Sequence, residues 1–379
     1  MTHAGPELHI HPDAIRHNLS VLRHHLKSYA VGQTPARIWA VAKSDAYGHG
    51  LIPTLRAFDA ADGLAVSSAD DAAACRAAGW HKPILLLGAG LDLTTLSGAG
   101  PGPLHVVVSN PEQVNQLEHN TKLPGLYIWL RYAGSLNHAG FKPADYAPTW
   151  HRLAALHAKG RIAGLGHFQH YAYAEDAAHL LAERRQFRQT IFGLSGPVCS
   201  ENSAATLNGP DVAATTQWVR SGIILYGVNP LGRHHKPGLA LRPAMTLKAR
   251  IHAIQQLEPG EAIGYGCTAR ARGPMRVGLV HCGYGHGYPR TLSTPAPCSI
   301  RGRKAHLFGR VSMDTLTIDI TAQPDIQPGD VVTLWGDHTV PVDHVAQAAD
   351  TIPAQLFTAI TPRVRRYYPG DPGYQEPTA

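Results

Sequence analysis

The sequence is poor in cysteine, and its five cysteines stand far apart. They are Cys75, Cys199, Cys267, Cys282 and Cys298. No two of them form a Cys-x-x-Cys pair, so neither a disulfide framework nor a thiolate zinc site is indicated. The 24 histidines include no His-Glu-x-x-His or similar spacing, so no metal site is predicted. No stretch reaches the roughly 20 apolar residues that a membrane-spanning helix needs.

The charge of the chain gives no clear evidence for a nucleic acid partner. The formal net charge is +7, but the basic residues are scattered, and their one dense group is Arg363, Arg365 and Arg366. A solvated surface or a small anionic ligand explains this distribution at least as well. The first residues, Met1 to Glu7, have no basic start and no apolar core. We therefore expect no secretory signal and a cytoplasmic location.

The first two thirds of the chain alternate between short apolar runs and helical segments. With 379 residues, of which 44% are hydrophobic, the chain is long enough for two domains. Apolar strand candidates lie at 38–42, 63–67, 84–88, 104–108, 126–131, 162–166, 197–200 and 218–220. Helical segments such as 68–78 and 146–159 separate them, which favours parallel βα units. Residues 12–236 are therefore predicted to form an α/β domain, a (β/α)8 TIM barrel. Periodicity leaves an open doubly wound sheet as an alternative.

The last third of the chain has a different pattern. After Pro237, alternating apolar and polar runs are separated by Pro-Gly and Gly-Asp turns. These runs lie at 245–254, 276–281, 298–308, 311–320 and 331–335, and the first amphipathic helix is expected at about 343–350. The pattern predicts a mostly-β C-terminal domain over 237–379. A short strand at 7–11 is a candidate to join it.

One strand end carries unusual chemistry. The apolar run Ile38–Ala42 ends at Lys43, and a polar turn over 44–50 follows. A lysine at the end of a buried strand is partly desolvated, which favours the neutral, nucleophilic amine. An ordinary lysine that reaches solvent from a strand end is the alternative.

Polar residues also follow four other predicted strands. Arg131 ends the fifth, His167 follows the sixth, Asn202 and Ser203 follow the seventh, and Arg220, Gly222 and Ile223 follow the eighth. Each has a plain alternative: a rim ion pair for the arginines, a buried core histidine, or a helix N-cap for Ser203. Together on the carboxyl face of one barrel they describe a site for an anionic heteroaromatic cofactor. A helix starting at Ser203 and the N–H groups after strand eight are suited to bind its phosphate.

Several stretches of the chain resemble the alanine racemase family. They are Val41-Ala42-Lys43-Ser44-Asp45-Ala46-Tyr47-Gly48-His49-Gly50, Glu201–Thr206, Val219–Gly227, Ala262–Gly266, Gly283–Arg290 and Gly309–Asp314. The resemblance runs from about Leu8 to Tyr367. It implies a pyridoxal 5'-phosphate enzyme, built as a (β/α)8 barrel followed by a β domain, that interconverts L- and D-alanine.

The resemblance also implies roles for single residues. Lys43 binds the cofactor covalently and serves as one acid/base group, and Tyr265 of the partner subunit serves as the other, which implies a homodimer with shared sites. The cofactor contacts fall on Tyr47, His167, Asn202, Ser203, Arg220, Gly222 and Ile223. Arg220 is assigned to the pyridine nitrogen, with His167 in the hydrogen-bond network of Arg220 and Tyr265. Substrate contacts fall on Tyr284 at the access route, and on Met313 and Asp314.

The chain departs from the family pattern at five positions, one of which is Ser44, where alanine is usual. Arg131 stands where the family usually has a lysine that is often carbamylated, and His138 stands where it has an arginine. We hypothesise that Arg131 itself supplies the cation for the substrate carboxylate, with His138 as a weaker partner. His286 replaces an aspartate, and Pro362 lies near where some members place a phosphate-binding tyrosine.

These departures leave other functions open. One is a racemase of broader specificity, or one for serine or basic amino acids, and another is a non-catalytic pyridoxal-phosphate-binding protein. A metal-dependent barrel hydrolase is a more distant alternative. A decarboxylase of the same architecture is disfavoured, because Val311-Ser312-Met313-Asp314 occupies the place of its acidic, cysteine-bearing motif.

Overall fold

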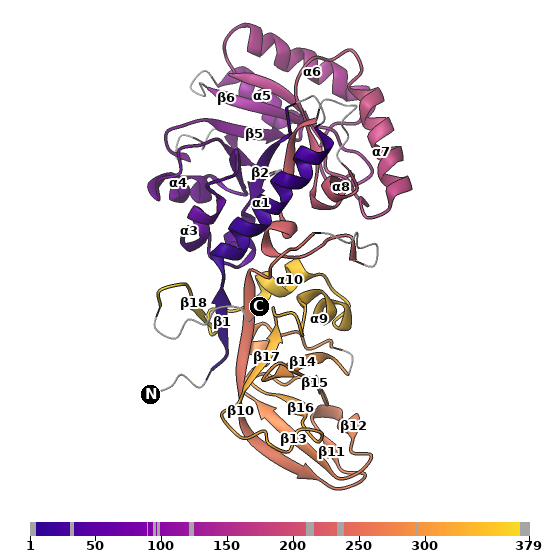
Figure 1. The fold of residues 1–379 in the computed structure, drawn as a ribbon. Coiled ribbons are helices and arrows are strands. Elements are labelled where there is room, and N and C mark those ends of the chain that lie inside the picture. Colours follow the sequence, from indigo (N-terminus) through magenta and orange to yellow (C-terminus); the bar gives the residue numbers. More distant parts are fainter. Residues whose placement is uncertain are drawn as a thin grey trace.

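The chain folds into an elongated molecule with two lobes (Figure 1). The computed structural model describes residues 5–30, 34–88, 90–93, 96, 99–120, 125–209, 216–232, 239–292 and 295–371. One lobe is a closed barrel of parallel strands and the other is built around an eight-stranded sheet. The predicted fold class, a (β/α)8 barrel followed by a mostly-β domain, is therefore confirmed.

The barrel strands follow one another around the ring in chain order. They are β2 (Arg37–Val41), β3 (Gly63–Val66), β4 (Ile84–Leu86), β5 (Leu104–Val108), β6 (Leu126–Arg131), β7 (Gly164–Phe168), β8 (Val198–Glu201) and β9 (Thr216–Ser221). The last strand pairs in parallel with the first, so that Trp39 lies opposite Arg220. This closure rules out the open doubly wound sheet.

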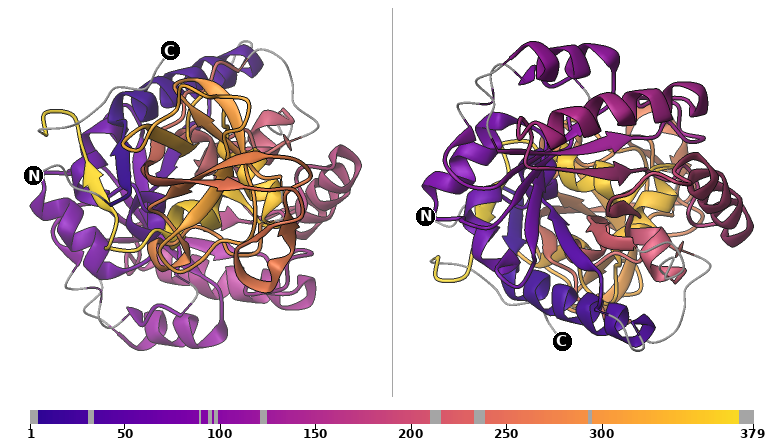
Figure 2. Two further views of the ribbon diagram at one scale, coloured as in Figure 1. Left: turned by 90° about the horizontal axis from the view of Figure 1, so that it is seen from below. Right: turned by 90° about the horizontal axis from the view of Figure 1, so that it is seen from above.

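Helices pack around the outside of the barrel and at the carboxyl ends of its strands, as the view from above shows (Figure 2). They are α1 (Pro12–Tyr29), α2 (Lys43–Tyr47), α3 (Leu51–Thr54), α4 (Ala69–Ala77), α5 (Pro111–His119), α6 (Pro143–Ala158), α7 (Ala177–Thr190) and α8 (Ser203–Leu207). The apolar face of α1, from Ile15 to Leu26, is buried. Polar N-caps start four of these helices, because the side chains of Ser68, Asn110, Asp176 and Asn202 accept backbone N–H groups.

Apolar side chains fill the inside of the barrel. They are Trp39, Val41, Ala65, Leu85, Val107, Trp129, Phe168, Cys199 and Trp218. Gly166 makes room for this packing, because a Cβ there would lie 2.6 Å from the Trp129 ring. The barrel is therefore a packed core, and its open end is the place left for a ligand.

The C-terminal domain is one mixed sheet with two short helices at its barrel side (Figure 1). Its strand order is β13-β16-β15-β14-β17-β10-β1-β18, and β13 also pairs with β10. The bounds are β1 (Glu7–Ile10), β10 (Met245–Leu257), β13 (Met275–Val280), β14 (Pro297–Ile300), β15 (Arg303–Leu307), β16 (Leu316–Asp319), β17 (Val331–Trp335) and β18 (Arg365–Tyr367). A separate hairpin joins β11 (Ala262–Ile263) to β12 (Ala269–Arg270), and the helices are α9 (Val342–Ala348) and α10 (Pro353–Ala359).

Two sequence expectations for this domain need comment. The single strand predicted at 298–308 is wrong: it is the hairpin β14–β15, turned at Arg301 and Gly302, which both have positive φ. The first strand, β1, pairs with β10 and β18. The expected boundary at 236/237 falls within 233–238, outside the described residues, so the division there stays a prediction.

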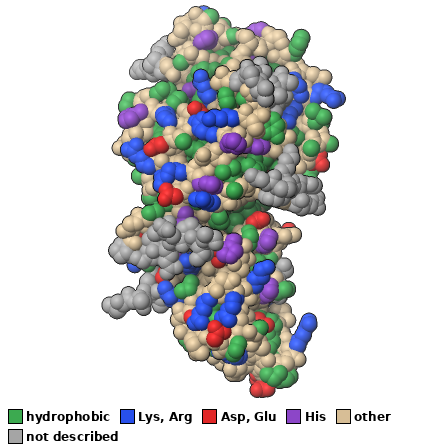
Figure 3. Space-filling model, in the orientation of Figure 1, with side chains coloured by type: hydrophobic (Ala, Val, Ile, Leu, Met, Phe, Trp, Pro, Cys, Tyr) green, Lys and Arg blue, Asp and Glu red, His purple; other side chains and the backbone are tan. Residues whose placement is uncertain are grey.

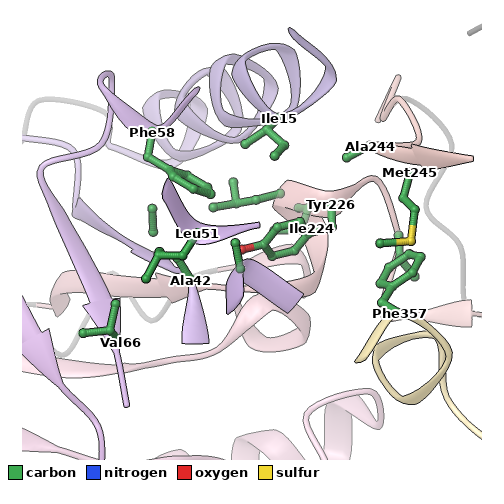
Figure 4. Packing of buried hydrophobic residues seen from close by; sticks show 14 of the residues in the cluster. Ile15, Ala42, Leu51, Phe58, Val66, Ile224, Tyr226, Ala244, Met245 and Phe357 are labelled. Atoms are coloured by element: carbon green, nitrogen blue, oxygen red, sulfur yellow. The ribbon is translucent and has the colours of Figure 1, made fainter. Parts of the chain in front are cut away.

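The two lobes share one apolar core where they meet (Figure 4). Tyr226 packs there among buried residues that include Ala42, Leu51 and Phe357. Its hydroxyl donates to the carbonyl of Val41 over 3.0 Å. The end of β2 is therefore held by Tyr226, which lies in the barrel lobe shortly after β9. Within the described ranges, no helix is both long and apolar enough to cross a membrane.

Candidate active site

A cavity of about 690 Å³ opens at the carboxyl ends of the barrel strands. Its walls contain many of the residues that the sequence predicts for the site: Lys43, Tyr47, Arg131, His138, Asn202, Ser203, Arg220, Gly222 and Ile223. The start of α10 and Asp343 of α9 complete one wall, so the C-terminal domain of the same chain helps to form the cavity.

Strand alternation explains why these side chains meet. Side chains along a strand point alternately to its two faces, so a residue two positions after an interior one faces the barrel axis again. Arg131 follows Trp129 in this way, Arg220 follows Trp218, and Lys43 follows Val41. The ends of three strands thus bring three cationic side chains to one opening.

The prediction for His167 is wrong, because the ring of His167 lies outside the barrel. It stacks on Trp150 with the ring centroids 3.9 Å apart, and its Nδ1 is 3.1 Å from the Tyr146 hydroxyl. Burial lowers its pKa to about 4. The strand was expected at 162–166 but runs over 164–168, so His167 lies inside it, next to the inward-facing Phe168.

The histidine of the site is His170, which the sequence analysis missed. It lines the cavity, and its Nδ1 lies 3.2 Å from a guanidinium nitrogen of Arg220. Burial, followed by the charges of Arg220, Arg131 and Lys43, lowers its pKa to about 3. The neutral ring accepts a hydrogen bond from Arg220. Its place two residues after Phe168 was the signal that could have found it.

Arg220 is fixed by the ends of β7 and β8. Its guanidinium donates to the carbonyls of Cys199 (2.7 Å), Gln169 (2.6 Å) and Ser200 (3.2 Å). It also lies over the Phe168 ring, 4.1 Å from the centroid. A guanidinium with this many acceptors keeps its place and its charge, so it can present a fixed cation to a bound ring.

Lys43 begins a strained turn. The next four residues, Ser44 to Tyr47, all have φ between 52° and 55°, although each left-handed residue other than glycine costs about 1–2 kcal/mol. His49 holds the turn, because its Nδ1 lies 3.0 Å from the carbonyl of Ala46 and 2.9 Å from that of Tyr47. Consecutive strained residues are typical of functional sites, and here they aim Lys43 and Tyr47 at the same cavity.

The Lys43 side chain lines the cavity and is exposed at its mouth in the single chain. Desolvation by the surrounding walls lowers its pKa, and the positive charge of Arg220 lowers it further. Both effects make the neutral, nucleophilic form more accessible. The plain strand-end lysine considered from the sequence does not have such neighbours.

Gly222, Ser203 and Tyr47 form a small polar cradle. The Gly222 N–H donates to Ser203 Oγ over 3.0 Å. A Cβ at Gly222 would lie 2.5 Å from the Tyr47 hydroxyl, so only glycine leaves this space open. Asn202 is committed to structure, because its Oδ1 caps α8 and its Nδ2 donates to Tyr171.

Arg131 faces the cavity with an unused donor. Its Nε is buried and has no hydrogen-bond partner. Burial and the charge of Arg220 lower the pKa of Arg131, which shows that the two cations are not neutralised at this point. His138 lines the same cavity. Such an arrangement suits a second anionic group beside the cradle.

Besides His167, four predicted residues are not on the cavity wall of their own chain. Tyr265, Tyr284 and Met313 are exposed on the C-terminal domain, by 66%, 39% and 54% respectively. Gly264 and Gly266, both with positive φ, project Tyr265 from the turn between β11 and β12, at the end of the molecule far from the barrel (Figure 1). Asp314 pairs with Arg363 over 2.6 Å, and this bond is the main cause of its lowered pKa.

The face of the molecule drawn in Figure 3 shows no large patch of a single charge among the described residues. On the face drawn in Figure 3, lysine and arginine side chains are spread over both lobes and mixed with acidic and apolar ones. The predicted scatter of basic charge is therefore visible on this face.

Comparisons with known proteins match this geometry. The profile of the alanine racemase N-terminal domain matches residues 10–230, and that of the C-terminal domain matches 244–368. An alanine racemase of Bordetella avium is 40% identical over 360 residues, which cover 94% of this chain and 96% of the relative.

Solved structures agree over the same length. The biosynthetic alanine racemase of Pseudomonas aeruginosa superposes with a TM-score of 0.88 at 34% identity, covering 97% of this chain and 99% of that one. The alanine racemase of Bartonella henselae, solved with covalently bound pyridoxal phosphate, has a TM-score of 0.79 at 24% identity, covering 97% of this chain and all of that one. Because both domain profiles match and a relative is 40% identical over nearly the whole length, this chain belongs to the alanine racemase family.

Proposed function

We propose that this chain interconverts L- and D-alanine, using pyridoxal 5'-phosphate in the barrel cavity and a tyrosine from a second copy. The observation that carries the proposal is the position of Lys43, whose pKa is lowered, in one cavity with Arg220 and the Gly222 cradle. The family and its relatives support the substrate. A cytoplasmic location belongs to the same proposal.

The cavity fits the cofactor at both ends. A phosphate suits the cradle, where Tyr47 and Ser203 supply hydroxyls and Gly222 and Ile223 supply backbone N–H groups. Arg220, at the opposite side, suits the pyridine nitrogen, and His170 and the strand carbonyls fix its orientation. When bound, pyridoxal phosphate withdraws electrons from the substrate and acidifies its α-hydrogen.

Lys43 carries the proton on one face of the substrate. Its amine would hold the cofactor covalently, and in its free form it would be a base beside the α-carbon of the bound substrate. Because burial and Arg220 lower the pKa of Lys43, its neutral amine, the form that can accept a proton, is more populated than that of an ordinary lysine. The strained turn over 44–47 keeps this amine within the cavity.

Tyr265 carries the proton on the other face, in the cavity of the partner subunit. Two opposed acid/base groups are needed to remove a hydrogen from one side and return one to the other. Tyr265 is 66% exposed in the single chain and does not line the cavity formed by the described residues. A head-to-tail homodimer would bury it against the barrel of the second copy, together with Tyr284 and Met313.

Arg131 and His138 bind the substrate carboxylate in this proposal. Arg131 lines the cavity near His170, whose pKa its charge lowers, and its buried Nε has no hydrogen-bond partner. A guanidinium can hold a carboxylate through two parallel hydrogen bonds. His138 completes this wall as a second polar contact.

Mixed dimers test the shared site directly. The Lys43→Ala and Tyr265→Phe chains are each expected to be nearly inactive. Co-expressed with different tags and purified as the heterodimer, they form one site that has both Lys43 and Tyr265. Because a two-fold dimer has two sites, roughly half of the wild-type activity per dimer should return. Polarimetry with L-alanine, and with L-serine, L-lysine and L-arginine in parallel, measures it.

Each outcome of this experiment has a definite meaning. If both groups act within one chain, every site of the heterodimer carries a lesion and activity stays at the level of the parents. If the wild type racemises another amino acid faster than alanine, the proposed substrate is wrong. A heterodimer of Lys43→Ala with wild type, which keeps one complete site, is the control for tagging and assembly.

A further inference from the structure

The loop that carries Tyr284 is bound edge to edge to the loop that carries Met313. The Tyr284 N–H donates to the Ser312 carbonyl over 3.0 Å, and the Gly285 N–H donates to the Met313 carbonyl over 2.8 Å. Both side chains are exposed, by 39% and 54%. The two loops therefore form one surface, and the position of Tyr284 depends on how the backbone at 283–287 is held.

Glycines let this loop sit close to its neighbours. A Cβ at Gly283 would collide with the carbonyls of Ser312 and Met313. A Cβ at Gly285 would collide with the guanidinium of Arg363. Gly287 has a φ of 93° and packs on the Ala359 carbonyl. The loop has little free space, so small changes in its internal hydrogen bonds should move Tyr284.

His286 closes the loop from inside. Its side chain is buried, and the Gly283 N–H donates to its Nδ1 over 3.2 Å. Its own N–H donates to the Gly283 carbonyl over 2.9 Å, and its carbonyl accepts the Thr361 N–H over 3.2 Å. Because Nδ1 is an acceptor here, the imidazole is neutral, with its hydrogen on Nε2.

The charges around His286 come from three other segments. Arg363, from the segment after α10, pairs with Asp314 of the 309–314 segment, and the ring of His281, just after β13, has its centroid 5.7 Å from that of His286. Burial lowers the pKa of His286, the charges of Arg363 and His281 lower it further, and Asp314 acts in the opposite direction. Two of these three groups thus oppose a proton on the ring.

We propose that His286 is a positioning residue for Tyr284, and that it acts as a neutral hydrogen-bond acceptor that closes the loop at 283–287. The importance of Tyr284 for substrate access rests on the proposed function. The role of His286 in the loop rests only on the contacts above. It gives this chain a titratable group at a surface that the proposal places at the partner's cavity.

The sign of the pH effect follows from the acceptor role. A proton on Nδ1 removes the acceptor for Gly283 and adds a positive charge beside Arg363 and His281. The open loop has an ordinary histidine pKa near 6.5, while the closed loop disfavours the proton. The closed loop is therefore most stable above pH 6.5 and loses stability as the pH falls below that value.

Hydrogen exchange of the peptide that contains 283–288, measured on the full-length holoenzyme, tests this role. After correction for the intrinsic exchange rate, its protection should fall by about tenfold between pH 8 and pH 5.5, the factor expected one unit below the pKa of the open state. His286→Asn, whose Oδ1 can accept from Gly283 at every pH, should keep its protection at pH 5.5. His286→Leu, which has no acceptor, should lose protection at both pH values.

The matched control is His252→Asn, which changes an exposed histidine whose ring lies 6.3 Å from that of His281. It should behave as the wild type. The inference is overturned if wild-type protection does not change with pH, if His286→Asn shows the wild-type pH dependence, or if His286→Leu stays protected at pH 8. Alanine racemisation is measured on the same samples: its absence would refute the proposed function and leave the exchange result intact.

Discussion

The functional side chains of the barrel cavity have close protein neighbours, whereas the functional tyrosine on the outer face of the C-terminal domain is exposed. In the cavity, Lys43, Arg131 and Arg220 converge from three strand ends, within walls that shift their pKa values or fix them by hydrogen bonds. On the outer face, Tyr265 stands on a turn between two glycines and is 66% exposed.

The difference indicates which interactions each group still needs. Within the described residues, the cavity side chains belong to one chain, and in the proposed function they act with a tyrosine from the partner. The tyrosine lacks the burial and the neighbours that would make it an effective acid or base. A second copy of the chain can supply both, because its cavity can surround the tyrosine and has a use for it as an acid/base group. Variants at Lys43, Arg131 and Tyr226 test whether the cavity residues of one chain have the roles that their contacts indicate.

The largest effect is expected at Lys43. Lys43→Ala removes the covalent anchor and one proton carrier together, so the rate of alanine racemisation should fall by at least about 10⁴-fold. Polarimetry measures the rate, and the absorbance of bound pyridoxal phosphate reports the lost bond. Lys159→Ala, at the end of α6 on the surface, is the matched control and should keep wild-type activity. More than a tenth of wild-type activity in Lys43→Ala would show that another group carries the proton.

The sequence predicted the barrel and most of its mouth, because both depend on local signals. Apolar runs mark strands, and polar residues at their carboxyl ends mark a barrel site. Lys43, Arg131 and Arg220 were found in this way and line one cavity. His170 was missed because the sixth strand was placed two residues too early. The strand continues to Phe168, so His167 lies inside it and points away from the barrel axis, and His170 is the histidine that follows its end.

Other features of the site depend on tertiary contacts that no local pattern contains. The left-handed turn at 44–47 is held by His49 and by the packing of α10, which the sequence analysis did not predict as a helix. Asp314 was assigned to the substrate, but it pairs with Arg363 from a segment that lies 49 residues later in the chain. Long-range partners of this kind become visible only when the fold is known.

A smaller effect is expected at Arg131, and its readout is KM. Arg131→Ala leaves the substrate carboxylate without its cation, which costs about 1.5–3 kcal/mol for a hydrogen bond to a charged group. KM for alanine should therefore rise by roughly 10- to 100-fold, with a smaller change in kcat. Arg131→Lys keeps the charge without the bidentate geometry, so its KM should lie between that of the wild type and that of Arg131→Ala. An unchanged KM in Arg131→Ala would remove Arg131 from the carboxylate site and leave His138 as the candidate.

The smallest effect on function is expected at Tyr226, which supports the cavity from behind. Tyr226→Phe keeps the ring, whose centroid is 4.5 Å from that of His49 and 4.7 Å from that of Tyr47. It removes the hydroxyl that donates to the Val41 carbonyl over 3.0 Å. A buried acceptor that loses its donor costs about 1–3 kcal/mol, so the free energy of unfolding should fall by that amount while kcat and KM stay near the wild-type values.

Urea unfolding at one fixed protomer concentration measures the change, since the stability of an oligomer depends on concentration. A large fall in kcat with unchanged stability would mean instead that the hydroxyl positions Lys43 through the end of β2, and the cavity would then be less rigid than its contacts indicate.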